Sequence, residues 1–250
     1  MNKPIIGIVS NRNFGETNRP FTYTTNFSNL VAEKIYSNNA LPIGVIFPYG
    51  VYEEETLKQC DGLVLQGGNR IELCQLLTVG YALKNNIPIL GICNGMQTMA
   101  GFDYLSQQVS IDEPYFYHKI STLYSKLGEE AFLSSCDDHN KENPFYIQSL
   151  ELAKHKVYFN EDSEFFDYYN TYIINALSLH NYACNKSIFD NSNYFKISGL
   201  SEDGVVEAIE SKNESHLAIG VQYHLEIDDQ GDPIFSDLVE EAKYIRKYKK

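Results

Sequence analysis

The sequence predicts an α/β fold in which a mostly parallel central sheet is flanked by helices. Short apolar runs, each followed by a polar or glycine-containing loop, recur through about the first hundred residues. Runs of this kind are typical of strands that are buried on both faces. Longer segments with helical periodicity lie between the runs, and this alternation favours right-handed βαβ units. A chain of 250 residues can form one such domain.

The first half of the chain supplies the parallel strands and their helices. Strands are expected at residues 4–10, 41–47, 62–66 and 87–92, and helices at 23–38, around 53–59 and at 71–84. Within 23–38 the apolar side chains recur at steps of three and four residues, which places them on one stripe of a helix. The run at 87–92 leads directly to Cys93, where a further helix can begin. Active sites in such sheets lie at the carboxyl ends of the strands.

The pattern breaks down between residues 106 and 169, where polar and charged stretches dominate. We interpret this segment as an insertion or lid within a single domain of residues 1–250, because a structureless loop of that length would be unusual. Strands are expected again at 172–176, 194–200, 205–210 and 217–223, and a helix at 234–249 closes the chain. Asp203-Gly204 predicts the turn between the second and third of these strands.

Composition limits the classes of function. The chain has 33 acidic and 20 basic residues, a formal charge of −13, which argues against binding to nucleic acid or an anionic membrane and favours a small-molecule substrate. The five cysteines are scattered, without metal-ligand spacing, so we expect neither a disulfide framework nor a metal or cofactor. The first apolar run is too short for a signal peptide, and no run approaches membrane-spanning length, so we expect a cytoplasmic protein.

Cys93 is the candidate nucleophile. It stands between Gly91 and Gly95, after an apolar strand and before a helix, which is the layout of a nucleophile elbow. Small residues are needed on both sides of such a turn because neighbouring backbone passes close to them. The positive end of the helix dipole favours a thiolate there. By itself the pattern is equally compatible with a buried cysteine in a tight turn.

His224 and Glu226 are the candidate base and its orienting partner. A thiol nucleophile needs a group that takes its proton and later gives one to the leaving group. His224 follows the apolar strand at 217–223, and Glu226, two residues later, can point to the same side and hold the imidazole. For the oxyanion of a tetrahedral intermediate, we expect the backbone N–H groups of Gly68, after the strand at 62–66, and of Asn94, after the nucleophile.

Together these segments resemble the class I glutamine amidotransferase superfamily. Within it the chain looks most like the γ-glutamyl hydrolases of peptidase family C26, the γ-glutamyl-γ-aminobutyrate hydrolase group. The likeness is carried by residues 3–8, by Asp61-Gly62-Leu63-Val64-Leu65-Gln66-Gly67-Gly68, by Gly91-Ile92-Cys93-Asn94-Gly95-Met96-Gln97, by residues 203–210, and by Gly220-Val221-Gln222-Tyr223-His224-Leu225-Glu226. The resemblance implies a flavodoxin-like fold and leaves roughly residues 106–169 uncovered.

The resemblance also implies a reaction. Cys93 attacks the γ-amide carbonyl of a small γ-glutamyl compound to form a glutamyl thioester, His224 protonates the leaving amine and then activates water, and Glu226 orients His224. Gln97 corresponds to a position that helps to hold the glutamyl group, and His180, in a stretch that resembles the substrate pocket of the family, is expected to contact substrate.

Departures from the family pattern leave the substrate and partners open. Leu225 replaces the usual proline between histidine and glutamate, and Asn94, Asn181 and Tyr182 also differ from the relatives, which indicates a changed leaving-group side of the pocket. One alternative is a glutaminase component that supplies ammonia to a separate synthase partner. Another is a non-catalytic binding relative, which an intact triad disfavours. The sequence is also compatible with a homodimer.

Overall fold

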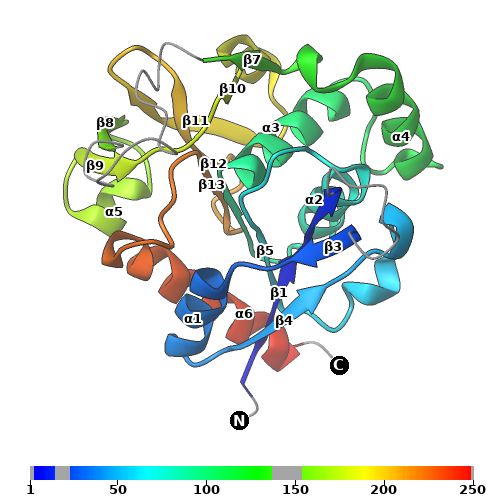
Figure 1. The fold of residues 1–250 in the computed structure, drawn as a ribbon, viewed down its shortest axis with the longest axis horizontal. Coiled ribbons are helices and arrows are strands. Elements are labelled where there is room, and N and C mark those ends of the chain that lie inside the picture. The colour runs from blue at the N-terminus through cyan, green and yellow to red at the C-terminus, as the bar shows by residue number, and fades with distance from the viewer. Residues whose placement is uncertain (1–2, 15–22, 137–153, 249–250) are drawn as a thin grey trace.

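A nine-stranded sheet forms the centre of the molecule, with the strand order β4-β1-β5-β6-β13-β12-β11-β8-β9 (Figure 1). The structure is a computed structural model that describes residues 3–14, 23–136 and 154–248. The strands of this sheet, in spatial order, are β4 (Leu41–Val45), β1 (Ile5–Val9), β5 (Gly62–Leu65), β6 (Ile89–Ile92), β13 (Ala218–Val221), β12 (Val206–Ser211), β11 (Phe195–Ser201), β8 (Lys154–Phe159) and β9 (Ile173–Leu177). The large helix-flanked sheet confirms the predicted α/β class.

The sheet has a parallel and an antiparallel half. Pairing is parallel from β4 to β13, and each further pair, from β13–β12 to β8–β9, is antiparallel. The β11–β12 pair is the predicted meander, and Gly204 takes a φ of +84° in its turn. That left-handed conformation explains why glycine occupies the position. The half of the sheet that holds the predicted nucleophile and base is therefore parallel across β5, β6 and β13.

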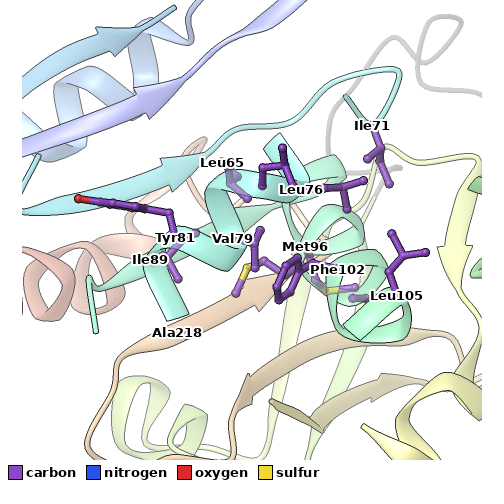
Figure 2. Packing of buried hydrophobic residues seen from close by; sticks show 14 of the residues in the cluster. Leu65, Ile71, Leu76, Val79, Tyr81, Ile89, Met96, Phe102, Leu105 and Ala218 are labelled. Carbon is purple, nitrogen blue, oxygen red and sulfur yellow. The ribbon is translucent and has the colours of Figure 1, made fainter. Parts of the chain in front are cut away.

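Helices cover both faces of the sheet. α1 (Asn29–Ser37) and α6 (Asp232–Tyr248) lie on one face, and α2 (Leu73–Asn85) and α3 (Asn94–Ser106) lie on the other (Figure 1). Side chains of β5 alternate between the two layers: Val64 packs in the α1/α6 layer, whereas Leu63 and Leu65 pack in the α2/α3 layer. Figure 2 shows part of the second layer, in which side chains of α2 and α3 pack together against β5 and β6.

Two of the predicted helices are shorter than expected. The segment 23–38 divides into β3 (Tyr23–Asn26), which pairs with β2 (Asn11–Phe14), and α1. The side chain of Ser28 accepts a hydrogen bond from the Val31 backbone N–H and so begins α1 there. The segment 53–59 contains one short 3-10 turn, Glu54–Thr56, in place of a helix. In both places the apolar periodicity was too short to distinguish a helix from a strand or turn.

The segment 106–169 holds regular elements. They include α4 (Phe116–Leu127), β7 (Leu133–Ser135), β8 and α5 (Phe165–Tyr169). β7 pairs with β10 (Tyr182–Cys184) in a small separate sheet, whereas β8 lies between β11 and β9 in the main sheet. Residues 137–153 of the predicted insertion lie outside the described part of the chain. β8 thus belongs to the central sheet although the sequence around it suggested an insertion.

No helix among the described residues is long and apolar enough to cross a membrane.

Candidate active site

Cys93 lies in a sharp turn between β6 and α3. Its backbone has φ +52° and ψ −108°, and residues other than glycine rarely adopt a positive φ. The Cys93 N–H donates to the Val221 carbonyl at 2.7 Å, which ties the turn to β13. A Cβ atom at Gly95 would lie 2.0 Å from the Leu65 carbonyl oxygen, and one at Gly91 would lie 2.8 Å from the backbone of Gly95. The two glycines therefore have the role that the sequence predicts.

His224 and Glu226 lie beside the cysteine because β13 and β6 are adjacent strands. The His224 N–H donates to the Leu177 carbonyl at 2.9 Å, and its Nδ1 lies 2.9 Å from Glu226 Oε1. A hydrogen bond joins the His224 imidazole to Cys93. All three side chains are mostly buried. The structure thus brings the predicted nucleophile, base and orienting carboxylate into one connected group.

Opposing effects set the protonation state of His224. Burial lowers its pKa, but the hydrogen bonds and charges of Cys93 and Glu226 outweigh burial and raise the pKa from 6.5 to about 10. The imidazole is therefore the cation at neutral pH. Because the pKa of His224 is higher in the folded protein than in the unfolded chain, the protonated imidazole stabilises the fold fully below about pH 6.5, and the contribution is lost as the pH rises through about 10.

We expect the titration of His224 to depend on Cys93. In the Cys93→Ala variant the imidazole loses one of its two charge partners while the burial remains, so its pKa should fall toward more ordinary values. The ring resonances of His224, followed by NMR against pH, should show a lower titration midpoint in the variant than in the wild-type protein. Equal midpoints would contradict the coupling between Cys93 and the His224 imidazole.

The Gly67-Gly68 turn at the end of β5 approaches the reacting groups. A Cβ atom at Gly67 would lie 3.1 Å from His224 Cε1, closer than most such contacts, and 3.6 Å from Cys93 Cβ, so glycine leaves room for this approach. Asn11 Nδ2 donates to the Gly67 carbonyl at 2.5 Å. The Gly67 carbonyl and the Gly68 N–H belong to one trans peptide and point in opposite directions. By binding the carbonyl, Asn11 therefore directs the Gly68 N–H away from itself. This role of Asn11 was not predicted from the sequence.

Asn94 is the first residue of α3 and is buried. The N–H groups of the first helical turn have no partner within the helix, so the Asn94 N–H can donate a hydrogen bond to a negatively charged oxygen beside Cys93. Its side-chain Nδ2 lies 3.4 Å from Gln97 Oε1, one helical turn further. Gly68 and Asn94, the two predicted oxyanion donors, both line the pocket that contains Cys93.

Gln97 makes its hydrogen bonds within the protein. Its Nε2 donates to the Tyr182 carbonyl at 2.7 Å and to Gln222 Oε1 at 3.0 Å. Gln222 Nε2 in turn lies 3.5 Å from Cys93 Sγ. No role for Gln222 was predicted from the sequence, although the two-residue period of a strand places it on the same side as His224.

His180 precedes β10 and lines the same pocket. Its Nδ1 lies 3.0 Å from the Tyr182 carbonyl oxygen and 3.5 Å from Cys136 Sγ, and its Nε2 lies 3.5 Å from Oε1 of the fully buried Glu207. These contacts hold the imidazole in the pocket wall, and its contact with substrate stays a prediction.

The pocket has a volume of about 1090 Å³. Five predicted site residues line it, namely Gly68, Cys93, Asn94, Gln97 and His180, together with Arg70 and residues of α4 and the turn that follows, including Tyr124, Glu129 and Glu130. The volume is enough for a small molecule of the size of a substituted amino acid. Within residues 3–14, 23–136 and 154–248, no group of three or more His, Cys, Asp or Glu side chains could hold a metal ion.

The chain is similar to known proteins over almost its whole length. The model of the family described as Peptidase C26 matches residues 72–226, more than half of the sequence. A glutamine amidotransferase-like protein of Rickettsia prowazekii is 27% identical, and the alignment covers 97% of this chain and 99% of the relative.

CTP synthases are also similar. That of Sulfurisphaera tokodaii is 30% identical over 69% of this chain, which spans 32% of the length of that enzyme. Among solved structures, the glutaminase domain of Trypanosoma brucei CTPS with bound acivicin superposes with a TM-score of 0.67 at 19% identity, covering 97% of this chain and 94% of that one. At that level of identity the similarity shows a common fold.

Proposed function

Because the chain belongs to the Peptidase C26 family, we propose that it is a cysteine-dependent hydrolase that cleaves the γ-glutamyl amide bond of a small γ-glutamyl compound and releases glutamate and an amine. One observation carries the proposal: Cys93, in a strained turn at a helix N-terminus, is hydrogen-bonded to an imidazole that Glu226 holds at 2.9 Å. That arrangement is the one that nucleophilic acyl transfer requires.

In the first half of the proposed reaction, the Cys93 thiolate attacks the γ-carbonyl carbon. The N–H groups of Gly68 and Asn94 stabilise the negative charge on the carbonyl oxygen. His224, already protonated, gives its proton to the amide nitrogen, and the C–N bond breaks to release the amine. The product is a γ-glutamyl thioester on Cys93.

In the second half, water enters on the side from which the amine has left. The neutral His224 accepts a proton from this water while the water oxygen attacks the thioester carbonyl. The C–S bond breaks, glutamate leaves, and the thiolate–imidazolium pair forms again. Glu226 keeps the ring in one orientation throughout.

A glutaminase role with a separate synthase is the second candidate, and the similarity to CTP synthases favours it. In this case the leaving group is ammonia, which a partner protein consumes. The chain spans about a third of those enzymes, so the partner would correspond to the remaining part. The nucleophile, base and oxyanion donors have the same roles in both reactions.

A substrate panel separates the two candidates. We expect the purified protein alone to release glutamate from at least one γ-glutamyl amide with a kcat/KM at least about tenfold higher than from glutamine, because a hydrolase selects its leaving amine by direct contacts. Glutamate release would be measured with glutamine and a series of γ-glutamyl amides of amino acids and amines. The Cys93→Ala variant is the control for contaminating activity.

The opposite result would be glutamine hydrolysis that appears only after a synthase is added, and it would favour the glutaminase. Turnover of neither class of substrate would favour the non-catalytic binding relative.

A further inference from the structure

A chain of side-chain amides leads from the pocket wall to the nucleophile. It begins at the Tyr182 carbonyl, passes through Gln97 and Gln222, and ends at Cys93 Sγ. Gln222 is completely buried and Gln97 is 5% exposed. Gln97 lies four residues after Cys93, and Gln222 lies two residues before His224. Buried amides are costly unless they are satisfied, so this chain of hydrogen bonds has a structural or chemical purpose.

The contacts determine the direction in which each amide points. Gln97 faces two oxygen atoms, Tyr182 O at 2.7 Å and Gln222 Oε1 at 3.0 Å, so its Nε2 must be the donor to both. Gln222 therefore accepts through Oε1, and its remaining group, Nε2, is directed at the Cys93 sulfur at 3.5 Å. Reversing the Gln222 amide would place its NH₂ group against that of Gln97 and its oxygen against the sulfur.

The sulfur needs such a donor when it is an anion. Cys93 is 6% exposed, so water cannot solvate a thiolate there freely. The protonated imidazole of His224 forms one hydrogen bond to the sulfur, and the side-chain N–H of Gln222 donates a second. Hydrogen bonds to a charged group are roughly twice as strong as those between neutral groups.

We propose that Gln222 is a positioning residue that donates a hydrogen bond to the Cys93 thiolate, and that Gln97 fixes the orientation of the Gln222 amide for this purpose. Gln222 makes the thiolate more abundant and holds the sulfur in one place beneath the pocket. It makes no bond to substrate. Its importance for hydrolysis rests on the proposed function, whereas its contact with the sulfur does not.

The test measures the thiol without a substrate. The rate of Cys93 alkylation by iodoacetamide, followed by mass spectrometry of the Cys93 peptide from about pH 5 to about pH 10, reports the fraction of thiolate. Gln222→Met keeps a long unbranched side chain but removes the donor, and we expect the midpoint of the pH profile to rise by about one unit, a tenfold loss of thiolate below the midpoint. Gln222→Glu replaces the donor with an anionic acceptor, so its midpoint should rise further.

Two further variants separate this role from a general effect on packing. Gln97→Met removes the group that orients Gln222 and should shift the midpoint in the same direction by a smaller amount; it also serves as the test if Gln222→Met does not fold. Gln107→Met removes a glutamine at the other end of α3, whose Nε2 donates to the Ile188 carbonyl at 2.8 Å, and should leave the midpoint unchanged.

A midpoint that stays within about 0.2 units of wild type in folded Gln222→Met or Gln97→Met would overturn the proposal, since a tenfold change corresponds to one full unit. So would an equal shift in Gln107→Met. A shifted midpoint in a protein that hydrolyses no γ-glutamyl amide would support the role of Gln222 and reject the proposed function, so the two failures are distinguishable.

Discussion

Replacement of Cys93 by alanine is expected to lower kcat/KM for the best γ-glutamyl amide by about 10⁴-fold or more, because the variant has no atom that can form the thioester. Alanine fits the turn as well as cysteine does, since both have a Cβ atom and the strain of φ +52° is the same. The fold should therefore persist. Steady-state kinetics and circular dichroism would measure the two effects separately.

The same variant tests for the covalent intermediate. Rapid acid quenching of the wild-type protein during turnover should reveal a mass increase equal to one glutamyl group on the Cys93 peptide, and the variant should show none. Hydrolysis at wild-type rates by Cys93→Ala, or the absence of any adduct on the wild-type protein at early times, would reject covalent catalysis through this residue.

Gly95→Ala is expected to destabilise the fold by about 3 kcal/mol or more, a larger loss than most single substitutions cause. The added Cβ would lie 2.0 Å from the Leu65 carbonyl oxygen. That oxygen belongs to β5, which is paired with β1 on one side and β6 on the other, so it cannot move without disturbing the centre of the sheet. Thermal unfolding should show a midpoint lower by about 10 °C.

Gly204→Ala is the matched control. Gly204 also has a constrained backbone, with φ +84°, but a Cβ there would have no atom within 4 Å. Its cost is that of the left-handed conformation alone, about 1 to 2 kcal/mol. If Gly95→Ala and Gly204→Ala were equally stable, the close approach of α3 to β5 would not be the reason for glycine in the nucleophile turn.

The sequence predicted the parallel half of the sheet more accurately than the rest. β1, β5, β6 and β13 are short apolar runs, and burial on both faces gives them a clear signal, whereas β4, at the edge of the sheet, is mostly exposed or half-buried. β8 has exposed or half-exposed residues at its beginning and lies in a polar segment, so its place in the sheet depends on tertiary pairing. β3 is too short for its period to be recognised.

The candidate site shows the same division. Cys93 and His224 could be predicted because turn chemistry and short motifs identify them locally. Asn11 and Gln222 could not, because their roles arise from contacts with residues more than 50 positions away in the sequence. An asparagine in a loop or a glutamine near the end of a strand is common in proteins. Only the fold shows which atoms the side chain contacts.

The hydrogen bond between the Cys93 N–H and the Val221 carbonyl joins the two strands that carry the proposed nucleophile and base. Their separation is consequently set by main-chain geometry, which changes little when side chains are exchanged. The outer walls of the pocket, by contrast, come from α4, the turn at Glu129 and the segment before β10. Under the proposed reaction, substitutions in these walls would change the accepted amine while the reacting atoms keep their places, which makes this site a suitable starting point for engineering new amide specificities.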